Sequence, residues 1–266
     1  MKIKAVQRGT IILYSLSVLW WLAIFARGVK ETTENYLFNI PMAVIPILAG
    51  VYTLFVFFKH KESYTRYLRL AIIFCSLALV SWGFGNIVYL YFNFHLNNPI
   101  PYKQFPDIFY AAGSTLWIAG LFFLVSSTGH KKMLYYLGRR AIIFCLVLLC
   151  FAETTYIFLA DKIEWTNLTK DYYFGAFYTV LDLVVFFQLC ALLYLILMRR
   201  ELRGMQKTLF IFLGFCFNYV ADVAYIIFAK EFFVASWIDF VFFTGAFFQG
   251  LGLLALLEMK SKKEQL

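Results

Sequence analysis

The 266-residue chain carries Asp107-Ile-Phe-Tyr-Ala-Ala-Gly113 and then Asp239-Phe-Val-Phe-Phe-Thr-Gly245, which are two copies of one pattern. Each copy runs on to a second glycine seven residues later, at Gly120 in the first and Gly252 in the second. This repeated order and spacing predict that the chain is an internal duplication. The pattern bears on the architecture, and it contains no known reaction constellation.

A related motif precedes each copy, Asn86-Ile-Val-Tyr89 in the first half and Asp222-Val-Ala-Tyr225 in the second. The signature therefore covers two consecutive apolar segments in each half. We expect two four-helix repeats, residues 1–133 and 134–266, which together form one membrane domain. Because four is an even number, both repeats enter the membrane in the same sense, as parallel repeats related by an axis along the membrane normal.

The composition is that of an integral membrane protein. Hydrophobic residues make up 62% of the chain, charged residues only 15%, and the mean hydropathy is +0.75; charged residues are about a quarter of an ordinary soluble domain. A transmembrane helix needs about 20 mostly apolar residues, and an all-α fold with eight such spans is predicted. The spans are expected at 9–26, 38–58, 67–93, 107–128, 138–160, 171–198, 207–229 and 236–258.

Basic residues set the predicted orientation. Most of the 24 Lys and Arg residues lie near one set of span ends, which the positive-inside rule assigns to the cytoplasm. Both termini are then cytoplasmic. The net charge of +9 is interpreted as this topology signal together with contact between the protein and anionic lipid heads of the bilayer. Nucleic-acid binding is not expected, because no basic soluble segment interrupts the spans.

The motif glycines are interpreted as helix-packing positions. A separation of seven residues is about two helical turns, so both glycines of a copy share one face. Small residues on a shared face let helix backbones approach closely in lipid. This interpretation covers Gly113, Gly120, Gly245 and Gly252, and the alternative is that the glycines make room for a ligand.

The motif aspartates, Asp107 and Asp239, each open a predicted span on the non-cytoplasmic side. An Asp at such a position accepts hydrogen bonds from unpaired backbone N–H groups and suits the positive end of the helix dipole. Both are therefore expected to be helix caps. A role at the mouth of a pocket is the alternative, because both face the same exterior surface.

Three acids, Glu153, Asp182 and Asp222, lie deeper within predicted spans, and Asn86 holds the position of Asp222 in the first half. A carboxylate at bilayer depth costs several kcal/mol, so such groups usually face the bundle interior or a water-filled cavity. An exterior-facing polar pocket is therefore predicted, with a cation, a proton or a cationic ligand as its occupant. The alternative is a structural hydrogen bond between helices, for example from Asp222 to a Tyr or to an Asn such as Asn218.

Two tyrosines complete the predicted binding set. Tyr89 and Tyr225 each lie three residues after the polar Asn86 or Asp222, which is close to one helical turn, so each can share its face and its pocket. The predicted ligand-binding residues are Asn86, Tyr89, Glu153, Asp182, Asp222 and Tyr225.

No catalytic residue, metal or cofactor is expected. The five cysteines form no Cys-x-x-Cys motif, and the three histidines lie at span ends or in loops, which disfavours zinc and haem sites. The sequence also has no Gly-rich phosphate loop, no Gly-x-Ser-x-Gly and no His-Glu-x-x-His. We therefore expect a protein that is not an enzyme.

The two motif pairs extend into Phe105-Pro106-Asp107 in the first half and into Ser236-Trp237-Ile238-Asp239 in the second. In this form they resemble the eight-helix membrane sensor region at the N-terminus of many bacterial diguanylate cyclases. The resemblance implies a multi-pass protein of the bacterial cytoplasmic (inner) membrane that passes a signal to a GGDEF-type output domain. This chain carries no Gly-Gly-Asp-Glu-Phe signature, so cyclase activity is not implied. A detached sensor half, a stand-alone relative and a truncated product remain as alternatives.

The leading functional hypothesis is a non-enzymatic membrane sensor that binds an unidentified small ligand from the exterior and signals through a cytoplasmic partner. A homodimer is a further expected assembly. The alternative is a small-molecule or cation transporter with a carboxylate site near the midplane, where Asp182 is expected, because many transporters bind substrates at repeat interfaces. An intramembrane enzyme is the least favoured hypothesis.

Overall fold

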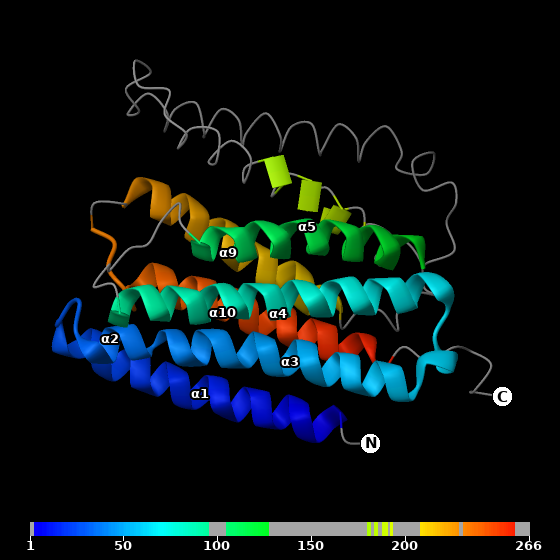
Figure 1. The fold of residues 1–266 in the computed structure, drawn as a ribbon, viewed down its shortest axis with the longest axis horizontal. Coiled ribbons are helices and arrows are strands. Elements are labelled where there is room, and N and C mark those ends of the chain that lie inside the picture. The colour runs from blue at the N-terminus through cyan, green and yellow to red at the C-terminus, as the bar shows by residue number, and fades with distance from the viewer. Residues whose placement is uncertain are drawn as a thin grey trace, which may run out of the picture.

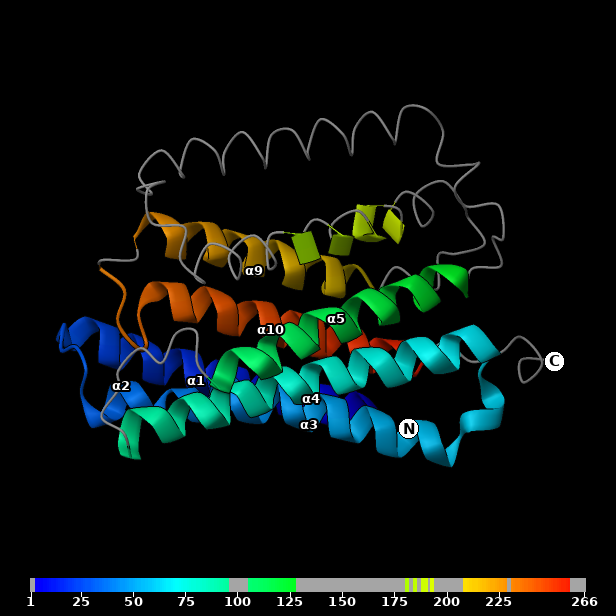
Figure 2. The same cartoon turned by 45° about the horizontal axis from the view of Figure 1, so that its top comes forward.

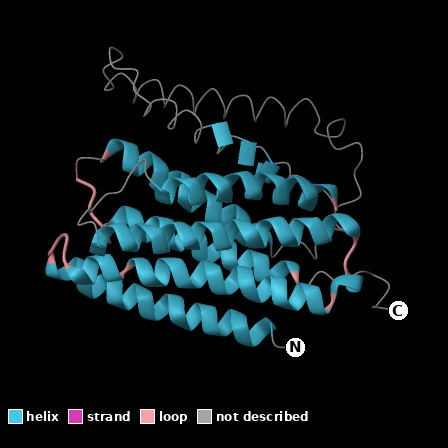
Figure 3. Ribbon diagram, in the orientation of Figure 1, coloured by secondary structure: helices cyan, strands magenta, loops and turns pink. Residues whose placement is uncertain are grey.

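The computed structural model describes residues 3–95, 105–127, 208–228 and 231–258, with short pieces at 180–181, 184–185, 188–190 and 192–193. Within these ranges the elements are helices, without strands (Figure 3). Their bounds are α1 Ile3–Arg27, α2 Thr33–Leu37, α3 Asn39–Lys59, the 3₁₀ turn η1 Lys61–Ser63, α4 Arg66–His95, α5 Phe105–Ser126, α9 Leu209–Ile227 and α10 Trp237–Leu256. The expected span 138–160 and most of 171–198 lie outside the described residues, and so do Glu153 and Asp182.

Five described stretches are long and apolar enough to cross a membrane. They are α1, Thr33–Lys59, α4, α5 and α10, and α9 adds a shorter apolar stretch, Leu209–Tyr225. The described part of the chain therefore has the architecture of a helical, multi-pass membrane protein. The first helix begins earlier than expected, at Ile3 rather than residue 9. Its hydrogen bonding continues beyond the apolar segment through Lys4 and Arg8, whose side chains are exposed.

The long helices lie side by side in one bundle (Figures 1 and 2). α4 packs between α3 and α5, α10 packs against α9 and α3, and α1 lies along α3 and α10. α1 begins and α10 ends at the same end of the bundle. The opposite end carries the end of α1, the end of α4, the starts of α5 and α10, and the 231–236 segment. We call it the Ala235 end and call residues 231–236 the Ala235 turn.

Apolar side chains fill two main clusters between these helices. One joins α3, α4, α5 and α10 through residues such as Phe57, Leu79, Leu121 and Leu253. The second joins α1, α3 and α10, and its members include Trp21, Phe38, Met42, Ile45, Phe243 and Phe247. Large apolar side chains of α1 that face away from the bundle, such as Ile12, Leu16 and Leu19, are exposed, as expected for a face in contact with lipid.

The motif glycines lie at close contacts within two pairs of helices. A Cβ at Gly120 of α5 would be 3.0 Å from the Cys75 nitrogen of α4, and one at Gly252 of α10 would be 2.7 Å from the Ile211 nitrogen of α9. Cys75 precedes Asn86 by eleven residues, and Ile211 precedes Asp222 by the same eleven. The two glycines therefore meet their neighbouring helices at positions that correspond in the motif.

The other two motif glycines, Gly113 and Gly245, lie close to backbone carbonyl oxygens of the neighbouring helix. A Cβ at Gly113 would be 3.3 Å from the Ala78 carbonyl oxygen, and one at Gly245 would be 2.8 Å from the Gly214 carbonyl oxygen. Gly245 also contacts the side-chain oxygen of Asn218. Gly245 thus has a second role besides helix packing, because its missing side chain leaves the space that the Asn218 amide occupies.

Candidate functional site

Tyr89, near the Ala235 end, interacts with polar side chains of three other helices. Its side chain, which is half-buried in α4, interacts electrostatically with the carboxyl groups of Asp239 and Asp107 and with the phenol groups of Tyr110 and Tyr225. These partners come from α5, α9 and α10. The Tyr89 cluster, defined by these five residues, therefore joins four helices from the two halves of the chain.

Tyr110 links the cluster to Asn86. Its hydroxyl donates a 3.3 Å hydrogen bond to Asn86 Oδ1, while Asn86 Nδ2 donates a 3.2 Å bond to the Trp82 carbonyl oxygen. The Tyr110 ring lies over Gly85, where an added Cβ would be 2.5 Å from a ring carbon. Asn86 is buried at 3% exposure. Both ends of its amide are hydrogen-bonded, and its link to the cluster is the bond from Tyr110.

The sequence analysis missed Tyr110, although a signal for it exists. Tyr110 lies three residues after Asp107, which is the same spacing that drew attention to Tyr89 after Asn86. The corresponding residue in the second copy is Phe242, which has no hydroxyl. The two halves therefore differ at this position as well as at Asn86 and Asp222.

Neither motif aspartate is at the N-cap position. Asp239 is the third residue of α10, whose N-cap is Ser236, and Phe105 is already helical two residues before Asp107. The predicted cap position is therefore corrected to the first helical turn for both. Asp239 Oδ2 accepts a 2.8 Å hydrogen bond from the Ala235 backbone N–H, so its carboxyl binds the turn that precedes the helix.

Asp107 is buried at 8% exposure, and its carboxyl group therefore faces the protein rather than the surroundings. In a bundle with a low local dielectric, two carboxyl groups that act on one phenol create a region favourable to positive charge. The described basic groups at this end are engaged elsewhere. Arg27 forms a 2.7 Å ion pair with Glu34, and Lys30 Nζ lies 4.8 Å from the Phe233 ring centroid.

Asp222 is half-buried in α9, one turn before Tyr225. The alternative expectation was a hydrogen bond from Asp222 to Asn218. The Asn218 oxygen accepts no hydrogen bond from the described residues and packs on Gly245, whereas a bond to the Asp222 carboxylate would be donated by Asn218 Nδ2 and stays a prediction. Of the six predicted binding residues, Tyr89 interacts electrostatically with Tyr225, and Asn86 is bonded to Tyr110, another partner of Tyr89. Asp222 lies on α9 one turn before Tyr225, whereas Glu153 and Asp182 lie outside the described residues.

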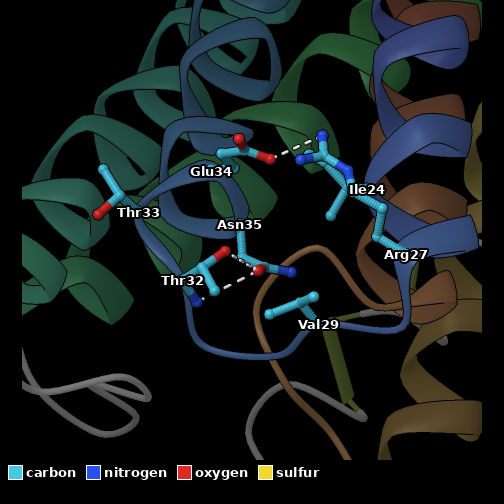
Figure 4. A pocket seen from close by; sticks show the side chains of 7 residues that line it. All are labelled: Ile24, Arg27, Val29, Thr32, Thr33, Glu34 and Asn35. Atoms are coloured by element: carbon cyan, nitrogen blue, oxygen red, sulfur yellow. Dashed lines mark hydrogen bonds and ion pairs between the residues drawn. The ribbon is translucent and has the colours of Figure 1, made fainter.

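A cavity of about 310 Å³ lies at the Ala235 end and is lined by none of the residues of the Tyr89 cluster (Figure 4). It is formed between the end of α1 and α2, and the Arg27–Glu34 ion pair spans it. None of its residues was predicted as a site residue. They are Ile24, Arg27, Val29, Thr32, Thr33, Glu34 and Asn35.

The polar groups of this cavity are largely used by the fold itself. Asn35 is fully buried, and its Oδ1 accepts hydrogen bonds from the Thr32 backbone N–H at 3.2 Å and from the Thr32 hydroxyl at 2.5 Å. Its Nδ2 donates to the Val234 carbonyl oxygen at 3.1 Å. Asn35 therefore connects α2 to the Ala235 turn, which is a structural role.

The described residues contain no group of three or more His, Cys, Asp or Glu side chains that could hold a metal ion. Cys75, Cys190 and Cys216 are not in disulfide bonds. No family model matches the chain, and neither a curated protein nor a solved structure is significantly similar to it. The function of this protein is therefore inferred from the residues of the bundle.

Proposed function

We propose that this protein is a non-enzymatic membrane sensor that binds a small cationic ligand at the Tyr89 cluster. The observation that carries the proposal is that the Tyr89 phenol interacts electrostatically with two carboxyl groups and two further phenol groups, which come from three other helices. Carboxylates compensate a positive charge in a medium of low dielectric, and tyrosine rings attract cations through their faces. A neutral or anionic ligand would leave these carboxyl groups uncompensated.

The positive-inside rule assigns the Ala235 end to the exterior. The opposite end carries Lys4 and Arg8 at the start of α1, Lys59 at the end of α3 and Arg66 at the start of α4. Retention of basic residues in the cytoplasm then leaves the Tyr89 cluster accessible from outside. Both termini are cytoplasmic in this orientation, where a signalling partner would read the state of the helices.

Eight spans in two parallel repeats remain our proposal for the architecture. It is supported by the matching glycine contacts, Gly120 on Cys75 and Gly252 on Ile211. The direction of the helices also agrees, because α4 and α9 both run toward the Ala235 end while α5 and α10 run away from it. The Tyr89 cluster takes members from both helix pairs, so a bound ligand would favour one relative arrangement of the pairs over another.

The sensor hypothesis also rests on the resemblance of both motif pairs to the membrane region of bacterial diguanylate cyclases. In such an arrangement the ligand acts by shifting the populations of two helix arrangements. The shift would reach the cytoplasmic helix ends, and a separate protein would supply the output. The inner membrane of a bacterium is the proposed location.

The test uses the full chain in lipid nanodiscs and measures its thermal unfolding temperature. The probes are choline, putrescine and ammonium, with 3,3-dimethyl-1-butanol as the neutral isostere of choline. At least one cation is expected to raise the unfolding temperature by about 2–4 °C when it saturates the site, because binding to the native state stabilises it. The neutral isostere is expected to have no effect.

Asp107→Asn and Asp239→Asn are expected to abolish the effect of the cation. Glu34→Gln is the matched control, since Glu34 is an exposed carboxyl at the same end of the bundle, and it is expected to leave the effect intact. If no cation stabilises the wild type, or if both Asn variants respond as the wild type does, the cationic site is refuted.

A transporter is the second candidate, and one observation favours it. Asn218 in the middle of α9 and Gln249 of α10 carry buried amide atoms, Oδ1 and Nε2, that have no hydrogen-bond partner in the described residues. Unsatisfied amides at this depth are typical of a polar path or a buried water. Accumulation of the stabilising cation in reconstituted liposomes would favour transport, and binding without flux would favour sensing.

A further inference from the structure

The Ala235 turn is bound from two sides through a single residue. Its Ala235 N–H donates to Asp239 Oδ2 at 2.8 Å, and the carbonyl oxygen of the same residue accepts a 3.0 Å bond from Trp21 Nε1. Asp239 belongs to the Tyr89 cluster, whereas Trp21 belongs to α1. One buried residue, Ala235 at 1% exposure, therefore connects the proposed binding site to the first helix.

Neighbouring residues of the turn are bound by the connection between α1 and α3. Asn35 Nδ2 donates to the Val234 carbonyl oxygen at 3.1 Å. Lys30 Nζ lies 4.8 Å from the centroid of the Phe233 ring. Three consecutive residues of the turn thus contact the N-terminal part of the chain, so a displacement of the turn changes all three contacts together.

The backbone of Ala235 is in a conformation that its surroundings impose. Its φ is +62°, in the left-handed region that residues with a Cβ rarely adopt. Such conformations persist where several interactions over-determine them, and here the bonds to Asp239 and Trp21 do so. Loss of the Asp239 bond would remove one of these constraints and allow the backbone angles of Ala235 to relax, which would turn its carbonyl group, part of the next peptide unit, away from Trp21.

α1 is the spanning helix most sensitive to this connection. Only 17% of the residues in its 18-residue apolar stretch are buried, against 33% to 67% in the other four described spans. Its contacts with α10 include Trp21 stacked on Phe240 at 4.2 Å, Tyr14 stacked on Phe247 at 3.9 Å and a 2.9 Å hydrogen bond between the hydroxyl groups of Tyr14 and Thr244. A helix with so little buried surface depends strongly on a few specific anchors.

We propose that the Ala235 turn couples the Tyr89 cluster to α1, which makes α1 the helix that carries the signal across the membrane. A cation bound beside Asp239 competes with the Ala235 N–H for the carboxylate, and release of that N–H weakens the Trp21 anchor. The identity of the trigger rests on the proposed function. The mechanical connection from Asp239 to Trp21 rests on the two hydrogen bonds alone.

The experiment measures amide hydrogen exchange in residues 3–14, the half of α1 far from the turn, using the full chain in lipid nanodiscs. Trp21→Phe removes the Nε1 donor and keeps a ring to stack on Phe240; Asp239→Ala removes the acceptor of the Ala235 N–H. Each is expected to accelerate exchange in residues 3–14 about threefold or more, because local opening follows the loss of an anchor. The double variant is expected to equal the larger single effect, since both changes break one connection.

Trp20→Phe is the matched control, because it is the adjacent Trp of α1, lies edge-on to Phe38 and is not bonded to the turn. It is expected to leave exchange in residues 3–14 unchanged. Additive effects of the two single changes, or wild-type exchange in both, would overturn the proposal. If Asp239→Ala does not fold, Trp21→Phe paired with Asp239→Leu gives the same cycle.

Exchange measured with choline, putrescine and ammonium separates this inference from the proposed function. Whichever of the three stabilises the wild type is expected to accelerate exchange in residues 3–14 and to have no such effect in Trp21→Phe. If that cation stabilises the protein without changing exchange in α1, the coupling is refuted while the binding site stands. If no cation binds, the proposed function fails, and the variant cycle still decides whether the connection exists.

Discussion

The side-chain oxygen of Asn218 on α9 lies directly against Gly245 on α10, in the space that any larger residue at position 245 would fill. The contact explains why one motif glycine is more demanding than helix packing alone requires. A Cβ added at Gly214 would be 2.6 Å from the Gly245 carbonyl oxygen, and one added at Gly245 would be 2.8 Å from the Gly214 carbonyl oxygen. The α9–α10 interface therefore has little freedom to accept an added methyl group.

Gly245→Ala is expected to destabilise the protein by about 2 kcal/mol, because the methyl group must displace both Asn218 and the backbone of α9. The measurement is the unfolding temperature of the purified protein in detergent. Gly9→Ala is the control, because a Cβ at Gly9 meets nothing within 4 Å, and helix propensity makes that change neutral or slightly favourable. Equal behaviour of the two variants would contradict the close approach.

Tyr110→Phe is expected to lower the free energy of unfolding by about 1 kcal/mol, the usual net contribution of one hydrogen bond. The change removes the hydroxyl that bonds Asn86 and keeps the ring that covers Gly85. Urea or thermal unfolding measures the loss. Tyr67→Phe, at an exposed tyrosine of the same helix as Asn86, should change stability by less than half as much, and a larger loss at Tyr67 would count against this account.

Asn39 and Asn93 form a buried pair between α3 and α4 near the Ala235 end, with a 3.1 Å bond from Nδ2 to Oδ1. Replacement of one partner by Ala removes this bond from the other, still buried amide and is expected to lower the free energy of unfolding by about 1–3 kcal/mol. The double variant Asn39→Ala/Asn93→Ala should therefore lose less stability than the sum of the single changes. A double-mutant cycle measures this coupling, and a coupling of zero would show that the two amides act independently.

Ala235→Val is expected to cost about 2 kcal/mol or more, because a β-branched residue tolerates a φ of +62° poorly. Ala235→Gly should be nearly neutral, since relief of the backbone strain offsets the greater flexibility of the unfolded chain. Comparison of the two unfolding temperatures checks the left-handed conformation. Equal losses in the two variants would mean that side-chain space, and not backbone angle, governs this position.

The orientation of the bundle leads to a labelling prediction. A cysteine at Val29, in the turn after α1, should react with a membrane-impermeant maleimide in intact cells, whereas one at Lys61 in η1 should react only after the cells are opened. Both native side chains are exposed. The reason is the greater number of basic residues at the Lys61 end. Reaction at Lys61 in intact cells would reverse the proposed topology.

Several features of the fold follow from local sequence properties. The positions of α1, α3, α4, α5 and α10 were predictable to within a few residues at most ends, because apolar runs of spanning length are visible in the chain itself. The early start of α1 was not, since hydropathy does not register helical residues such as Lys4 and Arg8 that lie beyond the apolar run. The span expected at 207–229 corresponds to α9, Leu209–Ile227, which is two residues shorter at each end.

The site was only partly predictable. Asn86 and Tyr89 attracted attention through their spacing on one helix face, a local property. Tyr110 could have been found by the same argument applied to Asp107. The structural role of Asn218 could not, because its partner is the absent side chain of a glycine on another helix.

The sequence alone determined that this is a helical membrane protein with a doubled motif, since hydropathy and spacing are properties of neighbouring residues. Only the tertiary structure decided that Tyr89 meets Asp239, and that Trp21 binds a carbonyl group 214 residues away. Helical periodicity tells which residues share a face. Which faces then meet depends on the rotation and tilt of each helix, and these are set by the summed packing of many side chains rather than by any local pattern.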